Sequence, residues 1–301
     1  MKVKSPKKPN NVFDASLKKR SYVGEIWHQL RKNPVAMICV GFLVIYLALI
    51  IFANVFAPYD YDKIDLTQKF VMPNAEHIMG TDDYGRDLFS RLLYGGRTSL
   101  LVALCAVCIG ITCGMLIGSV CGFFSGWVDN ILMRLMDIIM SVPSLLLAIC
   151  VSATLGSGVV NTAIAVSAAT IPMIARQLRS STLLIRGQEY IEASRTFGAS
   201  NAKIILTHVI PNSLAPIIVS ASLNVGTSIM AIAGLSFLGL GVQPPTPEWG
   251  NMLNNGLNYV YDFSTRWNVI VFPALFICLT MLIFNLLGDA LRDAMDPRMR
   301  K

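Results

Sequence analysis

Residues 35–57 run for 23 residues without an acidic or basic side chain. A helix of that length crosses the ~30 Å hydrocarbon core of a bilayer, and the run is too long for the apolar part of a signal peptide. Further apolar runs cover residues 99–124, 159–175, 214–240 and 268–287, with another around Pro143 that ends near Leu155. We therefore predict an all-α integral membrane protein with six transmembrane helices.

The runs divide the chain into five parts. We expect a basic N-terminal tail at 1–34, a first transmembrane helix at 35–57 and a polar segment at 58–97. A five-helix core at 98–288 carries a polar loop at 176–212, and a short tail follows at 289–301. Within the first tail, Tyr22 to Arg31 is expected to form a surface helix whose Ile26, Trp27 and Leu30 face lipid.

Positive charge gives the orientation of these parts. With six spans, the two tails lie on the same side of the membrane as the connection between the second and third spans and the 176–212 loop. Together these segments hold 19 Lys or Arg residues, whereas the segments on the other side hold 6. Cytoplasmic loops carry the excess of Lys and Arg. Both termini and the 176–212 loop are therefore predicted to be cytoplasmic, in a multi-pass protein of the bacterial cytoplasmic (inner) membrane.

Composition excludes several classes of protein. Hydrophobic residues make up 54% and charged residues 14% of the chain, against about 25% charged in soluble domains. The net charge of +7 comes without a basic patch interleaved with aromatics, so no nucleic-acid partner is expected. All seven cysteines lie in apolar runs; Cys105 and Cys108 have a metal-like spacing but no accompanying histidine, so neither a metal site nor a disulfide is predicted.

Two further patterns concern packing. Gly110, Gly114, Gly118 and Gly122 repeat every fourth residue, which lets helix backbones approach closely in lipid. Arg134 and Asp137 lie one helical turn apart and are expected to pair with each other.

In the 58–97 segment, alternating glycines, acids and arginines predict turns held by ion pairs, such as Asp87 with Arg86 or Arg91. No nucleophile or base accompanies these acids, so we expect no catalytic site there.

A polar, helix-prone island from Glu189 to Pro216 interrupts the apolar runs. Glycine tolerates the left-handed conformation that ends a helix, so Gly198 is the expected stop of a first short helix. Ser200 is placed to cap a second helix, which Pro211 is expected to close. Residues 192–194 combine one acid with two small residues, so a partner is able to approach that face closely.

This island resembles the coupling loop of ABC importer permeases. The resemblance rests on Glu192-Ala193, on Gly198 five residues after Ala193, and on the apolar-Pro ending at Pro211. Ser194 stands where the commonest pattern has Ala, and His208-Val209-Ile210-Pro211 where it has Ile-x-Leu-Pro. A solvated amphipathic loop of another kind of membrane protein is the alternative interpretation. Residues 80–97, 239–250 and 288–298 are similar to the dipeptide, oligopeptide and nickel group, and specifically to its second, C-type permease.

The resemblance implies a type I importer permease fold in which the loop forms a cytoplasmic coupling helix. It also implies these partners: a homologous first-type permease subunit, two ABC ATPase subunits and an extracytoplasmic solute-binding protein. No Gly-x-x-x-x-Gly-Lys-Ser/Thr loop is present, so ATP and Mg are expected on the ATPases, with no cofactor on this chain and no enzyme activity. The coupling residues implied are Glu189, Glu192, Ala193, Ser194, Gly198, Ala199 and Pro211.

Small di- or oligopeptides are the expected solutes, and nickel or another small solute is the alternative within the group. Asn224, Ser228 and Met230 are candidates for the pathway lining, although helix packing explains them as well. A self-contained secondary carrier or channel is the alternative from another class; it is disfavoured because we expect no His, Glu, Asp or Lys at mid-membrane. A membrane scaffold without transport activity is the third possibility.

Overall fold

A computed structural model of the protein describes residues 22–295, so residues 1–21 of the predicted basic tail and residues 296–301 of the C-terminal tail lie outside the described part. Within that part the regular structure is helical, apart from one isolated bridge between Thr81 and Asp87. The helices are α1 Tyr22–Lys32, α2 Pro34–Ile51, α3 Ala53–Phe56, α4 Leu88–Phe124, α5 Gly126–Ser141, α6 Ser144–Leu155, α7 Val159–Arg186, α8 Glu189–Thr196, α9 Asn201–Ile204, α10 Ile210–Phe237, α11 Trp249–Leu257, α12 Phe263–Arg266 and α13 Asn268–Met295.

Five helical stretches in the described residues are long and apolar enough to cross a membrane: α2, α4, α7, α13, and α9 with α10 as one unit. The pair α5 and α6 passes the same test together, but the two helices are bent by 96° at the break between them, a geometry that fits either one broken span or a re-entrant loop. The bend falls at Val142, which is extended because the following Pro143 disfavours helical geometry in the residue before it. With this pair counted once, the six predicted spans are all present.

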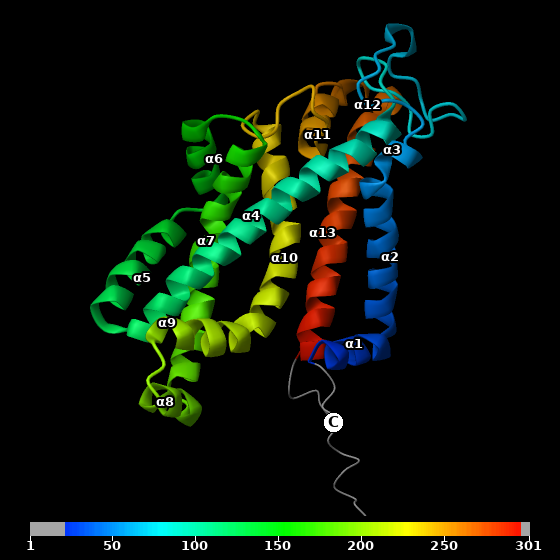
Figure 1. Ribbon diagram of the computed structural model, residues 1–301. Coiled ribbons are helices and arrows are strands. Elements are labelled where there is room, and N and C mark those ends of the chain that lie inside the picture. The colour runs from blue at the N-terminus through cyan, green and yellow to red at the C-terminus, as the bar shows by residue number, and fades with distance from the viewer. Residues whose placement is uncertain (1–21, 296–301) are drawn as a thin grey trace, which may run out of the picture.

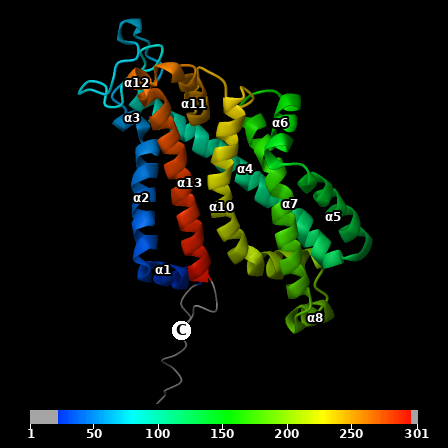
Figure 2. The ribbon, with the colours of Figure 1, turned by 180° about the vertical axis from the view of Figure 1, so that it is seen from behind.

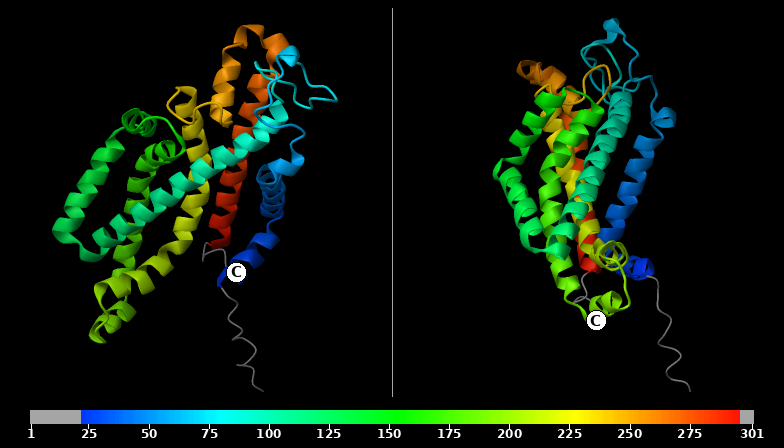
Figure 3. Two further views of the ribbon diagram at one scale, coloured as in Figure 1. Left: turned by 45° about the horizontal axis from the view of Figure 1, so that its top comes forward. Right: turned by 60° about the vertical axis from the view of Figure 1, so that its left-hand side comes forward.

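The helices form one bundle with two distinct ends (Figure 1). α2 lies beside α13, α10 stands between α13 and α7, and α4 crosses this row diagonally; the view from behind shows the same row in front of α4 (Figure 2). We call the end that carries α1 and α8 the lower end, and the end that carries α11, α12 and residues 57–87 the upper end. At the lower end, α8 projects below the spans (Figure 3).

The glycine ladder of α4 faces α7. A Cβ at Gly118 would lie 2.3 Å from the carbonyl oxygen of Ala175, and one at Gly114 would lie 2.7 Å from the Cβ of Ile174. Any larger residue at these positions would push the two backbones apart. The predicted close helix packing is therefore confirmed, and it makes α4 and α7 the most intimately packed spans.

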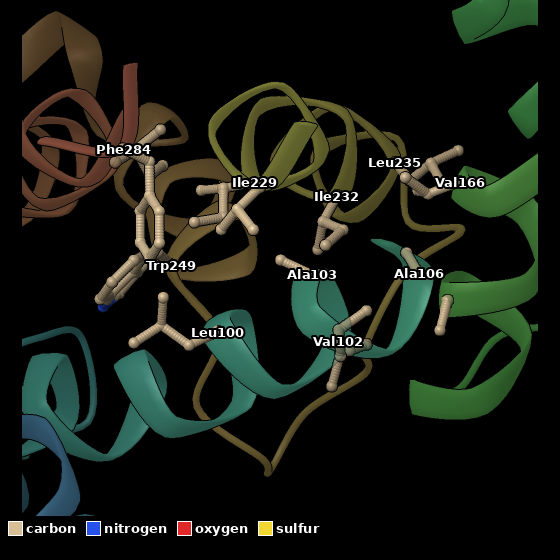
Figure 4. Packing of buried hydrophobic residues seen from close by; sticks show 14 of the residues in the cluster. Leu100, Val102, Ala103, Ala106, Val166, Ile229, Ile232, Leu235, Trp249 and Phe284 are labelled. Carbon is tan, nitrogen blue, oxygen red and sulfur yellow. The ribbon is translucent and has the colours of Figure 1, made fainter. Parts of the chain in front are cut away.

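The main core lies between α4, α10, α11 and α13. Trp249, the first residue of α11, is fully buried, and its indole Nε1 donates a hydrogen bond of 2.9 Å to the carbonyl of Leu92. This contact holds α11 against α4 at the upper end. The same apolar cluster extends away from Trp249 along α4 and α10 to α7 and includes Leu100, Val102, Ala103, Ala106, Val166, Ile229, Ile232, Leu235 and Phe284 (Figure 4).

Buried ion pairs do hold the turns of the 58–97 segment, but with other partners than the sequence suggests. Asp82 pairs with Arg86 at 2.7 Å and with Arg91 at 3.4 Å. Asp87 instead caps α4 through the backbone N–H and hydroxyl of Ser90 and lies 2.9 Å from His77 Nδ1. The predicted pairing of Asp87 with an arginine is wrong, because the helix cap and His77 occupy its oxygens.

The boundaries of several predicted parts also differ. The predicted first span at 35–57 is divided into α2 and the short α3, and α4 begins ten residues before position 98. The 176–212 loop is shorter than expected, since α7 continues to Arg186, and α13 extends into the 289–301 tail. Leu30 of the predicted surface helix is buried against Ala36, Ala290 and Ala294 instead of facing lipid, because these small residues leave room for it.

Candidate functional site

The projecting helix α8 ends at a left-handed turn. Gly198 has a φ of +81°, its N–H bonds the carbonyl of Arg195 at 2.9 Å, and the next N–H, of Ala199, bonds that of Ser194 at 3.0 Å. This pair of bonds is the Schellman arrangement, which satisfies carbonyls at a helix end and favours glycine at the left-handed position. The predicted stop at Gly198 is present.

The second half of the element differs from its prediction. Ser200 caps the next helix by accepting from Lys203 N at 3.4 Å, as expected. Pro211, however, does not close that helix. A π-helical turn at Ile205–Val209 joins α9 to α10, and Pro211 lies in the first turn of α10. The wider turn accommodates the missing proline N–H, so the chain continues without a break into the fifth span.

A small apolar cluster fixes α8 to the bundle. Ile191 is fully buried on the inner side of α8 and packs with Phe123 from the end of α4 and with Ile204, Ile205 and Val209. The Arg195 guanidinium lies 5.0 Å from the centre of the Phe123 ring, a cation–π contact. α8 is thus joined to α4 directly and to α10 through α9 and the π-helical turn, and a force applied to it reaches two spans.

The outer side of α8 is exposed and lacks partners in the described chain. Glu189, Glu192 and Ala193 are exposed, and neither carboxylate forms a side-chain hydrogen bond or ion pair with a described residue. Phe197, directly before Gly198, is 91% exposed. Sequence reasoning missed Phe197, although an aromatic residue next to the expected turn glycine was a usable signal. An exposed aromatic beside small and acidic residues fits a protein contact rather than a ligand pocket.

Two of the other predicted coupling residues, Ser194 and Ala199, are less exposed. Ser194 is half-buried; its Oγ donates to the carbonyl of Tyr190 at 2.8 Å and lies 3.5 Å from His208 Nε2. Ala199 is half-buried behind the turn, and Pro211 is exposed at the start of α10. The element therefore brings Glu189, Glu192, Ala193 and Phe197 to one projecting surface, while Ser194 and Ala199 support its geometry.

The three pathway candidates do not lie together on one surface. Asn224 and Ser228 are buried in the bundle, and the amide of Asn224 donates to the carbonyl of Ser220 at 2.7 Å. Met230 is 60% exposed. The first two positions therefore pack within this subunit, and Met230 alone of the three reaches its surface.

Charged groups on α5 and α7 were not foreseen as a group. Asp137 lies 2.7 Å from Arg176 of α7 and 4.0 Å from Arg134, so the predicted pair of Arg134 and Asp137 is the looser of its two contacts. Asp129 forms a second pair with Arg179 of α7. These contacts join helices 39 to 50 residues apart in the chain, a separation at which sequence spacing gives no signal. Among the described residues no group of His, Cys, Asp or Glu is arranged to hold a metal ion.

Comparison with known proteins identifies this architecture. Residues 114–301 match the family described as binding-protein-dependent transport system inner membrane component, and residues 21–75 match the N-terminal TM domain of oligopeptide transport permease C. The glutathione transport system permease protein GsiD of Shigella flexneri serotype 5b is 47% identical over 277 residues, covering 92% of this chain and 90% of the relative. GsiD of Escherichia coli O6:K15:H31 is 46% identical over the same length and coverage.

Solved structures agree on the fold. The MetNI methionine ABC transporter, in an inward facing conformation, matches with a TM-score of 0.50 at 18% identity, covering 66% of this chain and 95% of that chain. A second crystal form gives 0.51 at 17% identity, covering 67% and 96%. Both the all-helical importer fold and the resemblance drawn from the coupling loop are confirmed.

Family members act with a partner permease and an ATPase, and are themselves transport subunits rather than enzymes. The chain belongs to the binding-protein-dependent transport system inner membrane components, as a multi-pass permease subunit of an ABC importer.

Proposed function

We propose that this chain forms half of a translocation pathway for small peptides and receives its driving force through α8. The observation that carries the proposal is that buried apolar contacts fix α8 to α4 and to the α9 and π-helical segment that continues into α10, while the opposite side of α8 is exposed. Such an element transmits a push from a docked subunit to two spans at once. The named solute of its relatives, glutathione, is a tripeptide, which supports a short peptide as the solute here.

The complete importer contains this chain, a homologous first-type permease, two ABC ATPase subunits and an extracytoplasmic solute-binding protein. ATP and Mg are bound by the ATPases. The 19 to 6 division of Lys and Arg supports a cytoplasmic lower end, where the ATPases dock on α8, and an outward upper end, where the binding protein delivers the solute.

In the mechanism, closure of the ATPases on ATP moves each coupling element as a rigid body. The two permeases then open outward to accept the solute, and hydrolysis resets the inward-open state. Glu192 orients α8 in the ATPase groove, Ala193 permits close approach, and Gly198 sets the bend. Ser194 holds the inner face through Tyr190 and His208, and Phe197 supplies apolar contact area.

Uptake by the reconstituted importer tests the proposed function. Vesicles that contain both permeases, the ATPases and the binding protein should accumulate glutathione or a short peptide only with ATP, and this chain purified alone should hydrolyse no ATP. Uptake by the isolated chain without ATP would instead establish a self-contained carrier.

Orientation has its own test. After replacement of the native cysteines, Ser200→Cys should resist an impermeant thiol reagent in intact cells and Thr246→Cys should react with it. The reverse pattern would overturn the assignment of the lower end to the cytoplasm.

A further inference from the structure

Three charged side chains meet on an exposed surface between α5 and α7. Asp137 Oδ1 lies 2.7 Å from Arg176, and Asp137 Oδ2 lies 4.0 Å from Arg134. The side chains of Arg134, Asp137 and Arg176 are 84%, 46% and 53% exposed. Two arginines share one carboxylate, so this cluster, which we call the α5–α7 cluster, carries a net charge of +1.

A neighbouring ion pair on the same two helices shows what a purely structural contact looks like here. Arg179 grips Asp129 with two bonds, of 2.5 Å from Nε and 2.6 Å from Nη2, and the side chain of Asp129 is only 9% exposed. Its donors and acceptors satisfy one another. In the α5–α7 cluster, by contrast, the one ion pair of Arg134 with a described residue is the 4.0 Å contact, so among those residues its guanidinium donors are left for another acceptor.

The cluster lies toward the lower ends of two helices that contribute to the spans, with Arg134 eight residues after the start of α5 and Arg176 ten residues before the end of α7. α5 belongs to the bent pair α5–α6 and α7 is a candidate span, and the two run side by side (Figure 2). Ionised side chains in spans rarely face lipid; they face a protein interior or a water-filled cavity, and often mark the path of a solute. One turn beyond Arg176 the hydroxyl-bearing Ser180 is also exposed, so the polar surface continues along α7.

We propose that the α5–α7 cluster is an anion site on the translocation pathway, where Arg134 and Arg176 receive a carboxylate of the passing peptide. This inference rests on the proposed function for the identity of its ligand. Guanidinium groups present paired donors that match the two oxygens of a carboxylate. Asp137 competes for the same donors, and this weakens the site, as a pathway requires of a contact that a solute has to leave again.

Charge-selective labelling tests the site. In the cysteine-replaced chain within the assembled importer, Ile138→Cys places a thiol one turn from Arg134, at a position 65% exposed. The rate at which an anionic and a cationic methanethiosulfonate modify this cysteine is measured, and each rate is divided by that of the same reagent with a free thiol in solution. A net charge of +1 at ~7 Å in water favours the anionic reagent by about five- to tenfold. Arg176→Gln should bring the ratio to about one, and Asp137→Asn should raise it several-fold.

These shifts by themselves report the local charge, which a purely structural cluster would also carry. Protection of position 138 by a peptide carboxylate is the result that distinguishes a binding site. Trp127→Cys, exposed on the same helix about three turns away, is the matched control, and its ratio should be unaffected by Arg176→Gln. Absence of reaction with either reagent at position 138, or a preference for the cationic one, would overturn the proposal.

The source of the carboxylate is distinguished by two further arms. Millimolar trialanine should slow anionic labelling at position 138, whereas its C-terminal amide should not. A site filled by lipid headgroups would instead lose its anion preference when phosphatidylglycerol is added to phosphatidylcholine nanodiscs and would ignore trialanine, which would refute the peptide assignment. If trialanine protected position 138 in an importer that takes up no peptide, the proposed function would be wrong, whereas the anion site would still be supported.

Discussion

Two regions at opposite ends of this permease, the polar cap and α8, treat charge in opposite ways. At the upper end, the polar cap of residues 58–91 buries Asp82, Arg86, Asp87 and Arg91 and pairs each of them inside the chain. At the lower end, the carboxylates of α8 are exposed and have no partner among the described residues.

The charges of the polar cap have their partners within the chain, whereas the charges of α8 are available to a partner subunit. A buried charge that loses its partner is strongly destabilising, so the polar cap is built to keep one conformation. An exposed charge on a projecting helix contributes little to stability until another surface covers it. Mutations in the polar cap should therefore act on folding, and mutations in α8 should act on coupling at unchanged stability.

The largest effect is expected at Asp82. Asp82→Ala leaves Arg86 and Arg91 buried without their carboxylate and removes the acceptor for the backbone N–H groups of Tyr84 and Arg86. We expect a loss of about 3–5 kcal/mol in the free energy of unfolding. Thermal unfolding in detergent and the amount of inserted chain measure it.

Asp83 provides the matched control for that change. Its contact with Arg86 is 3.7 Å, and burial, followed by the charge of Asp82, raises the pKa of its carboxyl. A carboxyl with a raised folded pKa opposes folding when ionised, and this penalty disappears as the pH falls through that pKa. Asp83→Asn should therefore be neutral or stabilising at pH 7. Equal losses at both positions would contradict the partner assignment.

Gly198→Val should come next in size and should act on coupling. The surroundings leave space for a side chain, since beyond the adjacent residues no atom of the described chain lies within 4 Å of a Cβ at this position, but a β-branched residue at a φ of +81° costs about 1–3 kcal/mol locally. α8 would leave its angle to α9. We expect solute-stimulated ATPase activity and uptake to fall by about tenfold or more, with normal assembly of the permease pair.

The control for this change is Gly198→Asn, because asparagine tolerates the left-handed region. It should retain most of the coupling. Wild-type coupling in Gly198→Val at normal abundance would mean that the element does not transmit force.

How far the sequence predicts this molecule depends on the range of each interaction. The spans, the close packing of the α4 glycines and the bend at Gly198 are local or periodic features, and all three are present. The bend between α5 and α6 was signalled by Pro143, but a proline inside an apolar run does not reveal a change of direction as large as 96°.

Side-chain contacts between residues far apart in the chain could not be predicted from the sequence. Spacing favoured Arg134 for Asp137, whereas the nearer partner is Arg176, 39 residues away. Glu248 reaches Ser99 across 149 residues at 3.1 Å while it caps α11. Burial raises the pKa of that carboxyl, which marks a polar group placed by tertiary structure alone. Continuity through Pro211 likewise depended on a π-helical turn that no residue pattern announced.

A smaller effect on coupling is expected from Phe197→Ala. Phe197 is 91% exposed in this chain, so the free energy of unfolding should not change. Buried aromatic anchors contribute about 2 kcal/mol or more at protein interfaces, equivalent to roughly thirtyfold in affinity. Affinity between the permease pair and the ATPases, measured by titration in nanodiscs, should fall accordingly.

Tyr261 is an equally exposed aromatic, at 98%, in the connection between α11 and α13 at the upper end. Tyr261→Ala should leave the ATPase affinity unchanged. A similar loss in both variants would show that exposure of an aromatic side chain, rather than its place on α8, explains the result, and the contrast between the two ends would fail.

The smallest effect is expected at Glu192. Its carboxylate has no partner in the described chain, so Glu192→Ala should leave unfolding unchanged and weaken ATPase docking by only about 0.2–1 kcal/mol, the range of an exposed ion pair. Glu192→Gln separates the two ways in which the residue orients α8. If an ion pair matters, the glutamine variant should resemble alanine, and the difference from wild type should shrink at high salt, because salt screens exposed charges. If a hydrogen bond matters, glutamine should restore wild-type docking at any salt concentration. A loss of thermal stability in either variant would place Glu192 with the paired charges of the polar cap and contradict the division between the two ends.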